Sequence, residues 1–201
     1  MALAVVALVW FFPLWRVVPL AAPDRADVAF NPAEFAAQFW TKTLLPARGR
    51  AVDATVLAAG LRRDPVEAAR LHARAIGLGT AYYHLRGTGR VAAVERNRIV
   101  LALEGPEEAT VALETGAIFG NTVRDGTALL NVNDFPSLTE FNAVSAELNR
   151  LVEERVLPEL RRHAVVGARI EFAGCAEATA PVAGQPLLTL IPLFAEVRPA
   201  P

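Results

Sequence analysis

Residues 119–150 carry a dense group of amide, carboxylate and guanidinium side chains that are suited to polar recognition. The segment reads FGNTVRDGTALLNVNDFPSLTEFNAVSAELNR, and its candidate site residues are Asn121, Arg124, Asp125, Asn133, Asp134, Asn142 and Asn149. Amides and a planar guanidinium make directional contacts with hydroxyl-rich or anionic small molecules. The same residue types also fix long loops by bonding to backbone groups. The pattern therefore predicts either a ligand pocket or a structural polar network.

Other chemistry-bearing residues form no recognisable catalytic or metal-binding pattern. Cys175 is the only cysteine, so a disulfide within the chain and a cysteine-based zinc site are excluded, and we expect its thiol to be buried. The three histidines lack metal-ligand spacing; they are His72, His84 and His163. Gly87-Thr-Gly89 lacks the strand-before, helix-after context of a phosphate-binding loop. We therefore expect no catalytic residues, no metal and no cofactor, and the sequence favours a non-enzymatic protein.

Helical signals dominate the chain between residues 31 and 77. Asparagine or aspartate precedes each predicted helix as its N-cap, and a proline occupies the first position of two of them. The expected caps are Asn31, Asp53 and Asp64. We expect the first helix to end at Pro46, the second to run through Leu57 and close near Gly60, and the third to end at Gly77.

The period then changes to that of strands. We expect strands at 81–94, 99–103, 109–118, 165–176 and 187–197. A capping box at Ser137 begins a long helix between the third and fourth of these strands, with Phe141 and Leu148 on its apolar stripe and Pro158 kinking or breaking it. This order is that of the OB-fold, a partly open five-stranded barrel. The fold class is thus α+β, either an antiparallel five-stranded OB-like barrel or another sheet of the same order.

The N-terminal segment is almost wholly apolar from Ala2 to Trp15, which suits a secretory signal. Extended through Arg16 to Ala22, it is long enough for a membrane-spanning helix. A buried helix of the soluble domain is the remaining alternative. The predicted organisation is a signal or anchor at 1–22, a linker and helical region at 23–79, and an OB-like domain at 80–201. No cysteine follows the apolar run, so we expect no lipid attachment there.

Several blocks of sequence resemble an uncharacterised bacterial family of predicted periplasmic lipoproteins. They are FNPAEFAAQFW, GTGRV, FGNTVRD, NDFPSLTEFNAVSAELNR and VGARIEFAGCAE, and the likeness runs from about Phe30 to about Glu196. The resemblance implies an envelope location, a single domain and frequent association with sugar-uptake transporters. It supplies no activity and no catalytic residues.

Composition and resemblance together favour a binding module of the cell envelope. The formal net charge of −1 argues against a nucleic-acid partner, which requires a basic surface. We expect a periplasmic protein, tethered to the inner membrane or secreted after signal cleavage, that binds a small polar ligand or a sugar-transporter component. The alternative is a structural or assembly protein of the envelope that binds no small molecule.

Overall fold

The computed structural model describes residues 30–76, 81–105, 109–177 and 186–199. Every described residue except Phe30 belongs to one unit, Asn31–Pro201. The apolar segment 1–22, with its predicted N-terminal helix, lies outside the described residues. Within the described part of the chain, no helix combines the length and hydrophobicity that crossing a membrane requires.

Helices begin where the capping signals predict. The helical elements are, in chain order, α2 (Pro32–Phe39), η1 (Trp40–Leu44, a π turn), α3 (Leu45–Ala47), η2 (Arg48–Arg50, a 3-10 turn), α4 (Ala54–Arg63), α5 (Pro65–His72), α6 (Thr122–Asp125), η3 (Val132–Asp134, a 3-10 turn), α7 (Leu138–Arg155) and α8 (Leu157–His163). Side-chain oxygens accept hydrogen bonds from first-turn backbone N–H groups at the four predicted caps, Asn31, Asp53, Asp64 and Ser137. These bonds satisfy donors that have no partner inside the helix.

Helix ends are predicted less well. Pro46 does not end the first helix, because the Leu45 N–H donates to the Trp40 carbonyl in a π turn. The bonding register has therefore already shifted by one residue when the proline is reached, and the chain stays helical to the end of η2. Helix α4 likewise continues past Gly60 until the extended backbone of Asp64 ends it. Helix α5 ends well before Gly77, because the chain turns into a strand.

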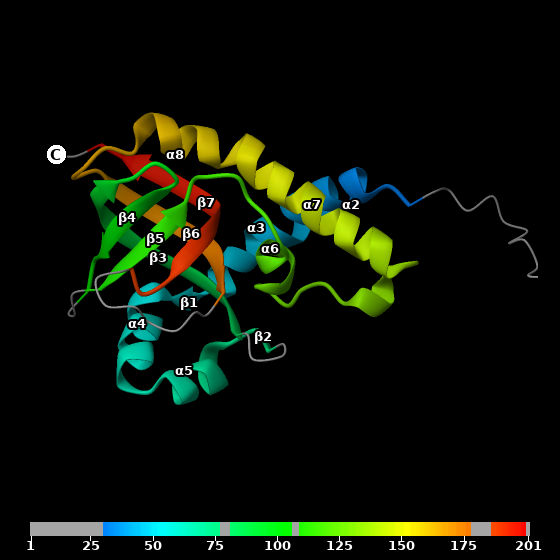
Figure 1. Ribbon diagram of the computed structural model, residues 1–201, viewed down its shortest axis with the longest axis horizontal. Coiled ribbons are helices and arrows are strands. Elements are labelled where there is room, and N and C mark those ends of the chain that lie inside the picture. Colours follow the sequence, from blue (N-terminus) through cyan, green and yellow to red (C-terminus); the bar gives the residue numbers. More distant parts are fainter. Residues whose placement is uncertain (1–29, 77–80, 106–108, 178–185, 200–201) are drawn as a thin grey trace, which may run out of the picture. The chain divides into compact units, whose positions relative to one another are not determined.

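The strands form one mixed sheet that folds back on itself. They are β1 (Val52–Asp53), β2 (Ala75–Ile76), β3 (Ala81–Val94), β4 (Arg98–Leu103), β5 (Thr110–Glu114), β6 (Arg169–Glu177) and β7 (Thr189–Arg198), in the order β1-β3-β4-β5-β7-β6, with β2 beside β3. The long strand β3 pairs with β6 from Tyr82 to Arg90 and with β4 from Gly89 onward. It therefore joins both sides of the curved sheet (Figure 1).

The observed sheet corrects the predicted topology in three respects. In the described part of the chain it has seven strands rather than five, because the two-residue strands β1 and β2 are too short to show a period. It is not wholly antiparallel, since β1–β3 and β5–β7 are parallel. The long helix consequently follows the fifth strand of the chain and not the third. The curvature is uneven, because β5 meets β7 only at Ala112 and Leu113.

Close backbone approach explains two glycines of the curved strands. A Cβ on Gly89 would lie 2.9 Å from the Ala102 carbonyl oxygen, and one on Gly174 would lie 2.5 Å from the Ile191 carbonyl oxygen. The second of these lies at the irregularity where β6 shifts register against β7. Strands that bend this tightly leave no room for a side chain at such points.

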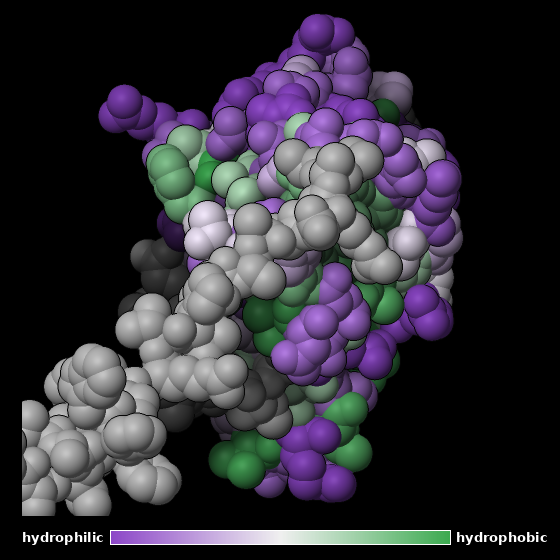
Figure 2. All heavy atoms as spheres, turned by 90° about the vertical axis from the view of Figure 1, so that its right-hand side faces the viewer, coloured by the Kyte–Doolittle hydropathy of each residue, from purple (hydrophilic) through white to green (hydrophobic). Residues whose placement is uncertain are grey.

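Helix α8 lies along one side of the sheet, α7 extends from there beyond the strands, and α2 packs against α7 (Figure 1). Both Phe141 and Leu148 are buried, as the apolar stripe predicts. The helix breaks at Val156, and Pro158 then takes an early position of α8, where its missing N–H costs nothing. Viewed from the end nearest α2, the surface is mostly hydrophilic, with hydrophobic side chains gathered between the polar ones (Figure 2).

Candidate functional site

The predicted Arg–Asp pair forms a partly buried network on α6. Arg124 is 6% exposed, and its Nε and Nη2 donate to the two carboxylate oxygens of Asp125 at 2.6 and 3.0 Å. Its Nη1 donates to Asn142 Oδ1 on α7 at 2.9 Å. The guanidinium carbon also lies 3.9 Å from the centre of the Phe141 ring, where a cation–π attraction adds to the hydrogen bonds. The network thus fastens α6 to α7.

The remaining predicted residues do not join this network. Asn149 is buried on α7 and donates from Nδ2 to the Gly120 carbonyl at 3.0 Å, so it holds the loop before α6. Asn121, Asn133 and Asp134 are exposed. None of the seven predicted residues lines any of the cavities described below.

Two residues that sequence reasoning missed anchor the chain between β5 and α6. Glu153 on α7 accepts the backbone N–H of Ile118 at 2.7 Å. The Arg161 guanidinium on α8 donates to the Thr115 carbonyl, from Nε at 2.9 Å. The expected strand 109–118 therefore stops at Glu114, because the helices take over the backbone groups that follow. Both residues resemble ordinary exposed helix charges in the sequence, so only the fold identifies them.

Close packing against β6 fixes the other side of α6. A Cβ on Gly126 would lie 2.6 Å from Cys175 Cβ and 2.5 Å from the Thr122 carbonyl oxygen. The Cys175 side chain is fully buried, as the sequence predicts, and burial raises the pKa of its thiol. The backbone at Gly126 therefore packs directly against the face of the sheet that carries Cys175.

We expect Gly126→Ala to lower the free energy of unfolding by about 1–3 kcal/mol, the usual cost of forcing a methyl group into a packed site. The φ of −62° at this position suits alanine, so the loss is steric in origin. Gly49→Ala is the matched control, because a Cβ there meets nothing within 4 Å. Urea unfolding of both variants measures the difference. If the two variants are equally stable, α6 can shift away from β6 at little cost in free energy.

A cavity of about 320 Å³ opens beside the end of α6, and we call it the arginine pocket. Its lining combines two arginines, a histidine and a threonine with small apolar side chains; the lining residues are Ala47, Arg50, Ala73, Arg74, His84, Thr127, Ala128 and Leu129. They come from α3, η2, the segment before β2, strand β3 and the turn after α6. No carboxylate is among these described lining residues, so the pocket presents positive charge to a ligand.

Two buried polar atoms in this lining have no hydrogen-bond partner among the described residues. They are His84 Nε2 and Thr127 Oγ1, on side chains whose residues are 3% and 6% exposed. A buried polar group without a partner costs roughly 1–3 kcal/mol, so such atoms are rare without a reason. Burial, followed by the charges of Arg74 and Arg50, lowers the pKa of His84 to about 4. His84 is therefore neutral at pH 7.

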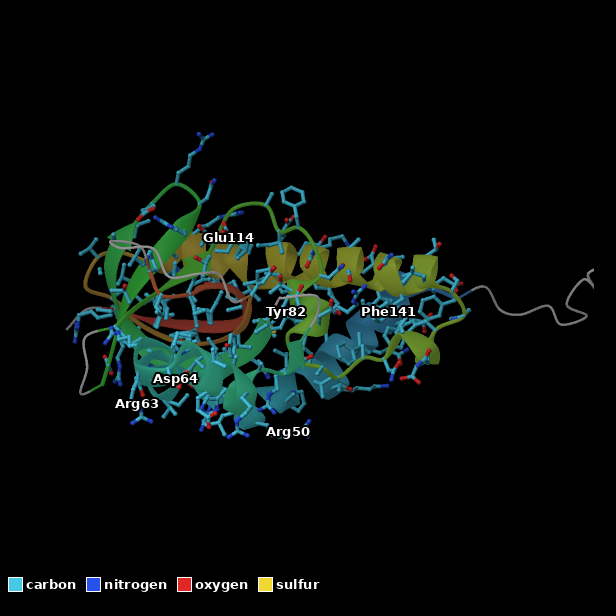
Figure 3. The ribbon with its side chains drawn as sticks, turned by 60° about the horizontal axis from the view of Figure 1, so that its bottom comes forward. Arg50, Arg63, Asp64, Tyr82, Glu114 and Phe141 are labelled. Atoms are coloured by element: carbon cyan, nitrogen blue, oxygen red, sulfur yellow. The ribbon has the colours of Figure 1, made fainter. Side chains whose placement is uncertain are left out.

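The two arginines are positioned by local structure. Arg74 Nη2 donates to the Arg50 carbonyl oxygen at 2.9 Å, which holds the two segments together. Arg50 ends the 3-10 turn η2 and lies at the lower edge of the molecule in Figure 3. Ala128, another lining residue, has a φ of +52°, an unfavourable conformation for alanine that the turn after α6 imposes.

A protein-family model matches most of the chain. The model of the family described as "Predicted periplasmic lipoprotein (DUF2291)" matches residues 4–194. The chain belongs to this family. The family description confirms the predicted periplasmic location, while a sugar-transporter association is not part of it. The comparison with curated proteins finds no match.

The fold of this family member is similar to that of a solved OB-fold protein from Thermotoga maritima. The TM-score is 0.71 at 24% sequence identity, over 84% of this chain and 99% of the other. At this identity the likeness shows the fold alone. It confirms an OB-fold relationship for the predicted α+β domain.

A larger cavity, of about 550 Å³, lies between α4 and α5, but its lining is less suited to a ligand. Its charged residues lie at the surface, Arg63 and Asp64 among them (Figure 3), and no unpartnered buried atom belongs to it. Among the described side chains, no group of three His, Cys, Asp or Glu residues is placed to hold a metal ion. The arginine pocket is therefore the candidate site.

Proposed function

We propose that this protein is a membrane-tethered periplasmic module that binds a small anionic ligand in the arginine pocket without catalysing a reaction. The observation that carries the proposal is the pair of buried, unpartnered atoms, His84 Nε2 and Thr127 Oγ1, in a lining that also holds two guanidiniums. An anion would satisfy all of these groups at once. Planar guanidiniums favour carboxylate and phosphoryl oxygens.

The size of the pocket limits the ligand. A volume of about 320 Å³ lies at the small end of the range for ligand pockets, so a single sugar-sized molecule or its charged group fits. The alanines and Leu129 offer apolar contact beside the charged groups. A sugar acid or sugar phosphate has this combination of charge, hydroxyls and carbon surface.

The predicted polar network takes a supporting role in this proposal. Arg124 and Asp125 fasten α6 to α7, and the turn that follows α6 carries Thr127 into the pocket lining. The network would thus position one wall of the site without touching the ligand. This role reconciles the two interpretations of residues 119–150, since the segment is structural at Arg124 and ligand-facing at Thr127.

The test uses three matched probes on the full chain: glucose, glucuronate and glucose 6-phosphate. They differ in charge at one position, so a response to the anionic probes alone isolates the arginines. A ligand at about 100 times its Kd stabilises a protein by ~2.7 kcal/mol, and we therefore expect at least one anionic probe to raise the melting temperature by about 5–10 °C. Glucose should leave it unchanged.

Variants test whether the rise in melting temperature comes from binding in the arginine pocket. Arg50→Gln together with Arg74→Gln should abolish it, whereas the control pair Arg62→Gln and Arg63→Gln, which removes equal charge beside the other cavity, should retain it. Thr127→Val should weaken binding without lowering the melting temperature of the free protein, because the hydroxyl it removes has no partner to lose. No response of the wild type to either anionic probe would favour the alternative, an envelope protein without a small-molecule ligand.

A further inference from the structure

His84 is buried although it lies on the face of β3 that points away from the core. Alternation along β3 places Tyr83 and Leu85 in the core, so His84 points to the other face of the sheet. The α6 segment covers that face, where Gly126 packs on Cys175, and His84 is consequently almost fully buried in the lining of the arginine pocket. The alternation along β3 would place the His84 imidazole in water, but the fold buries it beside Arg50 and Arg74.

The groups around His84 favour the neutral form of its imidazole. Desolvation opposes the charged form, and Arg74 and Arg50 repel it, so that its pKa lies near 4 and well below the ordinary value. Because the folded-state pKa is lowered, the unfolded chain binds the proton more tightly. Without an anion, His84 therefore lowers stability progressively as the pH falls from about 6.5 to about 4.

A bound anion reverses the sign of the local charge. It screens the two arginines, supplies a negative charge in the pocket that His84 lines, and offers an acceptor to the Nε2–H of the protonated ring. Each of these changes favours the imidazolium. We infer that the arginine pocket takes up one proton, at His84, when it binds a tetrahedral oxyanion. The inference rests on the proposed anion site.

The step is a simple proton transfer. One proton passes from solvent to the ring, both ring nitrogens then carry hydrogen, and Nε2–H donates to an anion oxygen. No covalent bond to carbon or sulfur changes. Affinity for the oxyanion must therefore increase as the pH falls, because the proton and the anion bind cooperatively.

The titratable groups nearest to His84 on its own face of the sheet do not line the pocket: Tyr82 and Glu177 pair with each other two residues along the strands from the His84–Cys175 pair. Arg50 faces His84 from η2 and Arg74 from the segment before β2, and both are cations that disfavour a charged imidazole ring. Thr127 faces it from the turn after α6. Cys175 pairs with His84 across β6, and burial raises its pKa, so its thiol stays neutral.

Sulfate is the probe for this test, because it remains a dianion between pH 5 and pH 8 and cannot itself supply the pH dependence. Isothermal titration of the full chain at these pH values measures the affinity, and repeating it in buffers of different ionisation enthalpy counts the protons. If binding restores the ordinary histidine pKa of about 6.5, the affinity for sulfate rises ~20-fold from pH 7 to pH 5. We expect close to one proton taken up at pH 5.

His84→Gln should bind sulfate with nearly constant affinity over this range, and the exposed control His163→Gln should behave as the wild type. Should His84→Gln fail to fold, NMR titration of the wild-type histidines decides the matter, since one ring must titrate at higher pH in the presence of sulfate. Sulfate binding that is equal at pH 5 and pH 8 would overturn proton uptake and leave the anion site standing. Sulfate that does not bind at any of these pH values would overturn both.

Discussion

Leu148→Ala should lower the free energy of unfolding by about 2–5 kcal/mol, the cost of a large-to-small change in a packed core. Leu148 is 0% exposed at the centre of α7, on the stripe that faces the rest of the domain. Removing three carbon atoms there leaves a cavity that neighbouring helices and strands can fill only partly. Chemical denaturation with an unchanged m value measures the loss.

Leu138→Ala is the matched control for this prediction. It makes the same chemical change at the first position of the same helix, where the side chain is 63% exposed. We expect a loss within about 0.5 kcal/mol, as for most surface substitutions. If Leu148→Ala costs no more than this control, the assignment of the core face of α7 is wrong.

Arg124→Ala should cost about 3 kcal/mol, because it leaves a partly buried carboxylate and an amide oxygen without their donor. The guanidinium now makes two bonds to Asp125 and one to Asn142 while lying over the Phe141 ring. Arg124→Lys keeps the charge but cannot form the planar two-point contact, so we expect a smaller but distinct loss. Thermal melting of both variants, with and without glucose 6-phosphate, is the measurement.

Arg150→Ala provides the control for the loss of a paired arginine. Arg150 on α7 pairs with Glu147 and Glu154, but its side chain is 46% exposed, and exposed pairs contribute roughly 0–1 kcal/mol. A loss at Arg124 no greater than at Arg150 would rule out a stabilising network. If Arg124→Lys instead kept full stability and lost only the ligand response, Arg124 would contact the ligand, contrary to the positioning role proposed for it.

Features encoded within a few residues of one another could be predicted from the sequence. The four N-caps depend on an oxygen two or three residues from the N–H that it accepts, and such spacing is visible in the chain itself. The bounds of β3 and the buried stripe of α7 follow from periods of two and 3.6 residues. The Arg124–Asp125 contact is likewise one between adjacent residues.

Strand pairing could not be predicted in the same way. The two-residue strands β1 and β2 exist only because the edge of β3 offers them hydrogen bonds. The parallel contact of β5 with β7 depends on how the helices between them return the chain to the sheet. Local periods determine which side of a strand faces the core but do not determine which strand lies beside it.

The candidate site depends on tertiary structure most of all. In the sequence, Arg50 and Arg74 resemble ordinary surface arginines, and His84 lies at a position of β3 that alternation assigns to the outer face. Thr127 lies within the segment predicted as functional, yet nothing in its type distinguishes it there. The curvature of the sheet and the placement of α6 over its outer face bring these four side chains to one cavity. The sequence by itself therefore determined the helix starts, the long strand and the family, whereas burial of His84 beside two arginines was decided only by packing between distant segments.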